Sequence, residues 1–192
     1  MVIVAVIFCG HAMGQKAGTF RDKRDGKVYK TITIGDQTWM AEDLQYKDST
    51  GNWCYKDDPA NCNEYGRLYN VKAALESCPD GWHLPQTEEW EKLINYLGGE
   101  QIAGAKLKST EKWRHSAITA TNGSGFSALP AGYRNYGGVF GGRGTQGYWW
   151  SASKFDNGAW YFALNNKDNK INKYGSNHRL SGYCVRCVMG KN

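Results

Sequence analysis

Short aromatic segments separated by glycines fill the second half of the chain, and they limit the folds that it can adopt. The clearest are residues 125–134, 148–153, 159–164 and 183–188. The 192-residue chain holds 24 glycines, and aromatic residues make up 14% of it. Because glycines supply tight turns and aromatic residues favour strands, this half predicts short antiparallel strands joined by long Gly/Asn-rich loops.

Two short helices are expected in the first half. The clearer one begins at Thr87, and Gly98 and Gly99 end it. Its apolar side chains follow the helical spacing i, i+3, i+4 and i+7, at Trp90, Leu93, Ile94 and Leu97. The shorter one covers residues 69–77 and ends before Pro79.

Residues 27–34 and 38–44 are the strand candidates of the first half. Helices therefore precede most of the strands, without the regular alternation that builds a parallel sheet. This order predicts an α+β fold. The length suits one domain with a sizeable core.

The first 14 residues predict a signal peptide. Residues 1–9 form an apolar run that is too short to span a bilayer, and small residues follow at the spacing that signal peptidase needs. The positively charged start is missing, which indicates a leader truncated at its start. We expect an exported protein, secreted or at the outer cell surface, whose mature chain has no transmembrane span.

The cysteines agree with export. Beyond Cys9, the chain holds five, at positions 54, 62, 78, 184 and 187. Two disulfides and one free thiol among them allow fifteen arrangements. A zinc site is not expected, because Cys184 and Cys187 have no second pair at zinc-ligand spacing. A thioredoxin-like pair needs a following helix, whereas residues 182–188 predict a terminal strand.

The formal charge of +6 does not predict a nucleic-acid partner. Lysines and arginines are spread along the whole chain. A nucleic-acid binder usually concentrates them in one stripe or motif. A spread charge of this size is ordinarily a solubility feature.

Several motifs carry a resemblance to a known family. In one-letter code they are TWMAEDL (38–44), YGRLY (65–69), CPDGWHLP (78–85), EW (89–90), LKS (107–109), GFSALPAGYR (125–134), WSAS (150–153) and VRCV (185–188). With these motifs in this order, the chain resembles the Fibrobacter succinogenes major paralogous domain, a family of exported bacterial domains. The resemblance covers about residues 25–190 and implies a variant of the C-type lectin fold. It does not define a biochemical activity.

The resemblance also implies two disulfides and one free cysteine. Cys54 pairs with Cys62, and Cys78 pairs with Cys187. The second pair closes a loop of roughly a hundred residues, worth on the order of 4 kcal/mol in the chain-entropy model. Cys184 stands where the family commonly has a small polar residue. Strand alternation places it on the face opposite Cys187, so we expect it to be the free thiol.

No catalytic residue is expected. The chain lacks the Gly-x-Ser-x-Gly elbow, the His-Glu-x-x-His motif and a phosphate-binding loop. The acid pairs Asp57-Asp58 and Glu88-Glu89 are adjacent in the sequence and point apart. Formylglycine-generating enzymes share the implied fold and use two cysteines, but Cys184 and Cys187 are expected on opposite strand faces. Activity is therefore not transferred from the fold.

No metal ligand or cofactor is expected either, although calcium stays open as a weaker alternative. Oxygen atoms for a hard cation could come from Asp156-Asn157 and from Asn166, Asp168 and Asn169. The Glu-Pro-Asn, Gln-Pro-Asp and Trp-Asn-Asp triplets of sugar-binding C-type lectins are absent.

What remains is a contact surface in the loops between residues 133 and 179. Tyrosine, tryptophan, asparagine and arginine are the residues that binding loops favour. The predicted ligand-binding residues are Tyr133, Arg134, Tyr136, Trp149, Asp156, Asn157, Tyr161, Asn165, Tyr174 and Arg179. Among the other aromatic residues, we expect Trp150, Trp160 and Phe162 in the core.

The sequence therefore predicts an exported, non-catalytic domain that binds a polysaccharide or a surface protein. Two alternatives stay open. One is a structural envelope module, and the other is an enzyme that uses Cys184 and Cys187 or an unrecognised acid pair.

Overall fold

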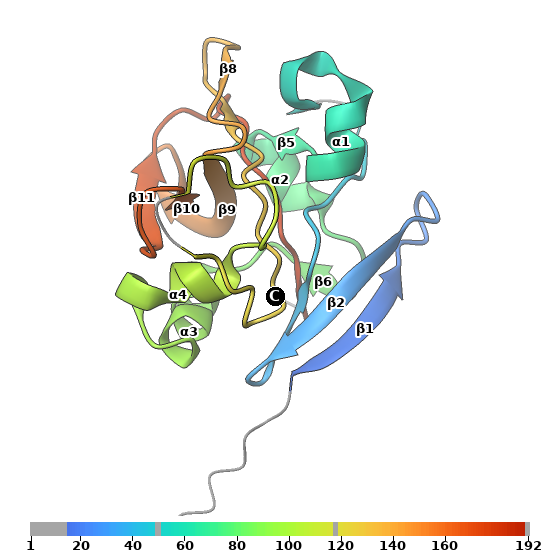
Figure 1. The fold of residues 1–192 in the computed structure, drawn as a ribbon. Helices are drawn as coiled ribbons and strands as arrows, with labels where there is room; N and C mark the ends of the chain where they lie inside the picture. Colours follow the sequence, from blue (N-terminus) through green and yellow to red (C-terminus); the bar gives the residue numbers. More distant parts are fainter. Residues whose placement is uncertain (1–14, 49–50, 117–118, 191–192) are drawn as a thin grey trace, which may run out of the picture.

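The fold is α+β, as the order of the sequence elements predicts. The computed structural model describes residues 15–48, 51–116 and 119–190. Its helices pack against small antiparallel sheets (Figure 1). The predicted signal peptide, residues 1–14, lies outside the described residues.

A five-stranded sheet joins the start of the described chain to its end. Its order is β1-β2-β3-β12-β6. The strands are β1 (Lys16–Arg21), β2 (Val28–Ile34), β3 (Gln37–Met40), β12 (Val188–Met189) and β6 (Trp82–His83). The strand predicted over 27–34 is confirmed as β2, whereas regular pairing in 38–44 stops at Met40. The polar segment that forms β1 gave no strand signal, because its side chains are exposed on both faces except for Phe20.

Four α-helices are present among the described residues, two of them predicted. They are α1 (Pro59–Tyr65), α2 (Val71–Ser77), α3 (Thr87–Tyr96) and α4 (Glu100–Leu107). The expected helices correspond to α2 and α3. The polar loop around Cys54 and Cys62 instead contains a 3₁₀ turn, η1 (Tyr55–Asp57), and α1, whose N-cap Asp58 accepts a hydrogen bond from Ala60 N.

Helix α4 was missed because it has no regular apolar stripe. Its Gly104 permits a close approach: a Cβ there would lie 2.4 Å from the Asn169 carbonyl oxygen. The helix is therefore held by the backbone of the loop around Asn169, to which Gly104 N donates a 2.9 Å hydrogen bond.

A second sheet carries the aromatic segments of the C-terminal half. It has the order β11-β10-β9, with β9 (Gln146–Phe155), β10 (Gly158–Asn165) and β11 (Asn172–Ser176). Residues 182–184 run along the free side of β9, where Trp149 pairs with Cys184. Two hairpin-like pairs complete the fold, β4 (Asn52–Trp53) with β5 (Leu68–Tyr69), and β7 (Tyr133–Arg134) with β8 (Phe140–Gly141).

The β9–β10 sheet separates two hydrophobic clusters. Trp149 and Phe162 lie in the cluster with Trp90, and Trp150 lies in the other, with Val185 and Cys187. Both faces of β9 are thus covered over part of its length. The expected core positions of Trp150 and Phe162 are confirmed, since they are 0% and 1% exposed.

Two aromatic predictions are wrong. Trp149 is fully buried rather than ligand-facing, because the cluster on its side of β9 is as closed as the one around Trp150. Trp160, expected in the core, is partly exposed. The strand register shifts between Ala159 and Tyr161, and this irregularity leaves Trp160 against Phe155 with the Lys173 ammonium 4.7 Å above its ring.

A buried ion pair lies at the centre of the first cluster. Asp43 Oδ1 accepts hydrogen bonds from Arg186 Nε at 2.7 Å and Trp149 Nε1 at 2.8 Å. Arg186 Nη1 donates to the carbonyl oxygens of Met40 and Phe126. Both charged side chains are fully buried. Gly66 (φ +80°) makes room for Asp43, because a Cβ there would lie 2.7 Å from the Asp43 Cβ.

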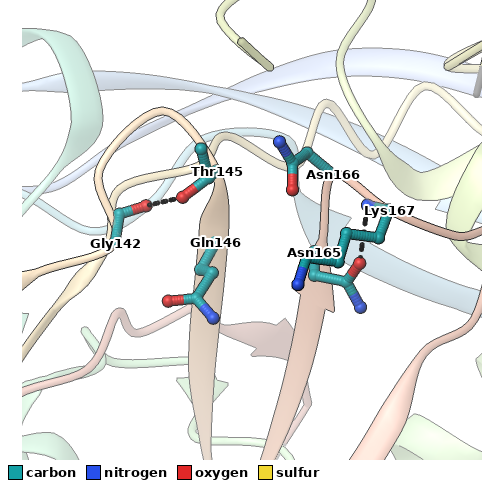
Figure 2. Close-up of a pocket in the computed structure, with 6 residues that line it drawn as sticks. All are labelled: Gly142, Thr145, Gln146, Asn165, Asn166 and Lys167. Carbon is teal, nitrogen blue, oxygen red and sulfur yellow. Dashed lines mark hydrogen bonds between the residues drawn. The ribbon is translucent and has the colours of Figure 1, made fainter. Parts of the chain in front are cut away.

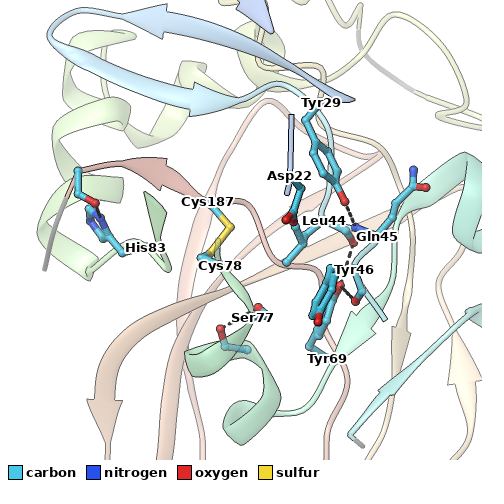
Figure 3. Close-up of a disulfide and its surroundings, with 12 residues drawn as sticks. Asp22, Tyr29, Leu44, Gln45, Tyr46, Tyr69, Ser77, Cys78, His83 and Cys187 are labelled. Carbon is cyan, nitrogen blue, oxygen red and sulfur yellow. Dashed lines mark hydrogen bonds between the residues drawn. A yellow bond between two sulfur atoms is a disulfide. The ribbon is translucent and has the colours of Figure 1, made fainter. Parts of the chain in front are cut away.

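Both expected disulfides are confirmed. Cys54 is bonded to Cys62, and Cys78 to Cys187. Figure 3 shows the second bond beside the end of β12, near Ser77 and His83. Among the cysteines of the described residues, Cys184 is the free one, and burial together with nearby Asp43 raises the pKa of its thiol well above the usual value. Alternation is also confirmed: Cys184 lies in one cluster, and Val185 and Cys187 lie in the other.

The two disulfides should differ in their effect on stability. They span sequence separations of 109 and 8 residues. In the chain-entropy model, replacing Cys78 and Cys187 by alanine costs about 4–5 kcal/mol, against about 2.5 kcal/mol for Cys54 and Cys62. Urea unfolding of the two double variants measures this ratio. Equal losses would show that the long loop is already restricted in the unfolded chain.

The buried ion pair should be far more sensitive than an exposed one. Asp43→Asn leaves the Arg186 guanidinium buried without a counter-charge, so the free energy of unfolding should fall by about 3–5 kcal/mol. The matched control is Asp36→Asn, whose partner Lys92 is exposed and 2.6 Å away. That control should leave stability unchanged within error. A comparable loss in both variants would contradict the role given to burial.

Candidate functional site

The outward face of the β9–β10–β11 sheet carries three cross-strand rows. The strand register places Trp150, Tyr161 and Tyr174 side by side in the first row. Tyr148, Ala163 and Asn172 form the second row, and Gln146 and Asn165 form the third. Because side chains alternate along a strand, these residues share the face opposite Trp149 and Phe162.

Other side chains cover part of this face, and tyrosines lie at the border between the covered and the open part. The Tyr183 ring lies 4.4 Å from Trp150 and 4.7 Å from Tyr161. Tyr148 stacks on Tyr183 with centroids 5.2 Å apart, and Tyr133 meets Tyr148 edge-on at 5.4 Å. Tyr148, Tyr161 and Tyr183 are half-buried. They therefore pack over the fully buried Trp150, whose Nε1 donates to the Tyr69 carbonyl oxygen at 2.6 Å.

Beyond this border the face opens into a depression above Ala163. Ala163 is the small member of its row, between Tyr148 and Asn172, and its methyl group leaves the middle of the row low. The resulting cavity of about 240 Å³ is called here the tyrosine hollow. It is lined by Gln146, Tyr148, Tyr161, Ala163, Leu164, Asn165, Asn172 and Tyr174.

A larger polar cavity adjoins the tyrosine hollow and shares Gln146 and Asn165 with it. This amide groove has a volume of about 590 Å³ and is lined by Gly142, Thr145, Gln146, Asn165, Asn166 and Lys167. Figure 2 shows Gln146 on one strand, with Asn165 and Lys167 facing it at the end of the neighbouring strand.

Some polar groups of the amide groove are already bonded and others are free. Thr145 Oγ1 donates to the Gly142 carbonyl oxygen at 3.1 Å, and Asn165 Oδ1 accepts from Lys167 N at 2.7 Å. Within the described part of the chain, the Gln146 amide and the Lys167 ammonium have no hydrogen-bond or ion-pair partner. They are therefore available to a ligand.

The hydroxyls of Tyr148, Tyr161 and Tyr183 are neutral at physiological pH. Burial raises the pKa of Tyr148 to about 12, and nearby Tyr161 adds to the effect. Burial also raises the pKa of Tyr161 and of Tyr183. The site thus presents uncharged rings and hydroxyls that can donate or accept hydrogen bonds.

The profile of one protein family, described as the Fibrobacter succinogenes major domain, matches residues 32–189. The chain belongs to this family. Searches of curated proteins and of solved structures found no match.

In this Fibrobacter succinogenes major domain, four of the ten predicted ligand-binding residues gather at the open face. Tyr161, Asn165 and Tyr174 line the tyrosine hollow, and Tyr133 contacts Tyr148 at its border. Trp149 is the one that the structure places in the core.

The other five predicted residues lie elsewhere on the domain. Arg134 lies over the Trp53 ring at 4.1 Å, and Tyr136 stacks on His178 at 4.1 Å. Asp156 and Asn157 occupy the exposed turn at the far end of β9 and β10, where Arg179 donates to the Asn157 carbonyl oxygen. The structure therefore does not bring all ten residues together.

Several residues of the site are not among the ten predicted ones, including Gln146, Ala163, Lys167 and Tyr183. Ala163 could have been found from strand alternation, because it follows the core residue Phe162 on β10. Gln146 and Lys167 gave no signal, since their role depends on the pairing of Gln146 with Asn165 across two strands.

The remaining groups considered for chemistry are occupied or dispersed. Asp168 Oδ1 accepts from Asn165 Nδ2 at 3.3 Å and from Lys170 N at 3.0 Å. Across residues 15–48, 51–116 and 119–190, no three His, Cys, Asp or Glu side chains gather closely enough to hold a metal ion. Cys187 is bonded to Cys78, so it forms no pair with Cys184. None of the helices among the described residues has the length and apolar character needed to cross a bilayer.

The raised pKa of Tyr148 should make the domain sensitive to alkaline pH. Above pH 10 the unfolded chain loses this phenolic proton, whereas the folded chain keeps it up to about pH 12. The free energy of unfolding should therefore fall as pH rises through this window, and less steeply in Tyr148→Phe. Urea unfolding at pH 8 and pH 11 measures the difference, with the exposed Tyr136→Phe as control. An unchanged pH dependence in Tyr148→Phe would contradict the prediction.

Proposed function

We propose that this domain binds carbohydrate through the tyrosine hollow and the amide groove and performs no catalysis. The observation that carries this proposal is the continuity of the two cavities, which share Gln146 and Asn165. One extended ligand can therefore meet aromatic rings at one end and free polar groups at the other.

The chemistry of a saccharide suits both parts. A sugar ring has an apolar face that packs on aromatic side chains, and hydroxyl groups that require hydrogen-bond partners. Tyr148, Tyr161 and Tyr174 supply large contact areas with few rotatable bonds. The Gln146 amide offers both donors and an acceptor, and within the described residues it has no competing partner. Binding sites commonly combine such an apolar surface with a few placed polar groups.

Calcium and other cofactors are not part of this proposal. The amide groove offers amide oxygens but is lined by no carboxylate, and the Lys167 ammonium in its lining repels a cation. Asp168, the nearest candidate carboxylate in the sequence, already accepts two hydrogen bonds through Oδ1.

The proposal places the domain outside the cell, on a C-type-lectin-like scaffold. Two disulfides support an oxidising compartment, because structural disulfides are rare in the cytosol. The apolar composition of residues 1–9 supports export by a signal peptide. Membership of the family and the α+β architecture support the lectin-like scaffold.

A protein ligand is the second candidate, favoured by a separate observation. Tyr136, Val139 and Leu180 are 60%, 63% and 59% exposed. Tyr136 and Val139 belong to the β7–β8 turn, and Tyr136 stacks on His178 close to Leu180 in the sequence. An exposed apolar tip of this kind suits a protein surface better than a sugar.

Filling the tyrosine hollow should weaken carbohydrate binding. Ala163→Leu places a larger side chain on the floor of the hollow, between Tyr148 and Asn172, and removes no polar group. Isothermal titration against a panel of neutral and acidic polysaccharides should show affinity reduced by at least about tenfold, or about 1.4 kcal/mol. The matched control, Ala17→Leu, alters an exposed alanine of β1 and should bind normally.

Two further measurements complete the test of the carbohydrate proposal. Titration with calcium and with a chelator should give the same affinity, since no cation is proposed. Thermal unfolding of both leucine variants confirms that each is folded. A wild-type domain that binds no polysaccharide would overturn the carbohydrate proposal and favour a protein ligand at the Tyr136 tip.

A further inference from the structure

The net positive charge of the chain comes from the C-terminal segment that carries the candidate site. Residues 133–192 contain nine lysines and arginines but only two acidic residues, a formal charge of +7. Residues 1–132 contain fifteen and sixteen, a formal charge of −1. The cations are spread along the chain, but the acids are not, so the whole excess of +6 comes from the C-terminal segment.

Most of these cations are engaged within the protein. Arg186 is buried against Asp43, and Lys173 pairs with Glu91 at 2.7 Å. Arg143 donates to the Asn61 side chain, and Arg134 lies over Trp53. Lys167 differs from them because it is exposed, lines the amide groove and, within the described residues, has no ion-pair partner.

A second cation lies beneath the same loop. Lys108 is fully buried, and its ammonium donates to the Asp168 carbonyl oxygen at 2.5 Å. Burial lowers the pKa of Lys108 to about 8, so this amine is still largely protonated at pH 7. The loop that bears Lys167 therefore rests on a positive charge, which increases its attraction for an anion.

We propose that the ligand is an acidic saccharide, with a uronate carboxylate paired to the Lys167 ammonium in the amide groove. This inference rests on the proposed carbohydrate function. A neighbouring sugar of the same polysaccharide packs in the tyrosine hollow. The two sites are close enough for this, because Gln146 and Tyr148 are two strand residues apart, a distance of about 7 Å. The ion pair selects the charged sugar, and the tyrosine rings hold the chain irrespective of charge.

The test compares uronate polymers with their own methyl esters. Polygalacturonate, alginate and hyaluronate are titrated into the full chain, alongside the corresponding esters, which keep the sugar backbone but remove the negative charge. We expect at least one acid form to bind at least about tenfold more tightly than its ester, and its affinity to fall as salt rises. Equal affinity for acid and ester would overturn the inference while leaving carbohydrate binding intact.

Variants assign the effect to Lys167. Lys167→Gln should reduce the preference for acid over ester to near unity, with affinity for the ester retained. The matched control is Lys154→Gln, another exposed lysine, eight residues along β9 from Gln146. Equal weakening by both variants would show general attraction of a polyanion and overturn the inference. Tighter binding of single-stranded DNA than of every uronate polymer would also overturn it.

The same experiment distinguishes the two proposals. A domain that binds neutral polymers and esters but no uronate retains the carbohydrate function and loses the acidic ligand. A domain that binds none of the polysaccharides loses both.

Discussion

The buried pair of Asp43 and Arg186 joins the segment after β3 to the segment before β12, 143 residues apart in the sequence. Two desolvated charges cost several kcal/mol each, and additional hydrogen bonds to the pair offset part of this cost. Within the described residues, Asp43 Oδ2 and Arg186 Nη2 are buried without a hydrogen-bond partner. Here the segment after β3 runs beside residues 185–187, with Met40 N bonded to Cys187 O and Leu44 N to Val185 O. Asp43 also accepts from Trp149. The pair therefore fixes β9 relative to the five-stranded sheet, and replacing either partner affects both sheets at once.

The proposed binding face follows from this constraint through strand alternation. With Trp149 held against Asp43, its neighbours Tyr148 and Trp150 must point to the opposite face of β9. Tyr161 and Tyr183 cover Trp150. Tyr148 lies two residues away along β9, on the same face, and lines the hollow where this cover ends. An interaction in the core thereby sets which tyrosines line the tyrosine hollow.

The sequence predicted the α+β class, both disulfides and the two helices with clear signals, because each depends on local spacing or on family motifs. It failed at Trp149 because alternation shows only that adjacent residues point apart. Whether one or both faces are buried depends on what packs there, and here both are. It missed Gln146 and Lys167 because a groove built from two strands depends on their register. The register opposes Gln146 to Asn165, a pairing that no local pattern encodes.

The packing of the tyrosine rings affects the binding affinity that this face can provide. Tyr148, Tyr161 and Tyr183 pack on one another and on Trp150, whose indole is itself hydrogen-bonded to the Tyr69 backbone. Rings held in this way lose little conformational freedom when a ligand arrives, so more of the contact energy appears as affinity. The exposed Lys167 side chain has no such support and must be ordered on binding. For the proposed acidic saccharide, the hollow should therefore contribute most to affinity, and the groove most to the choice between ligands.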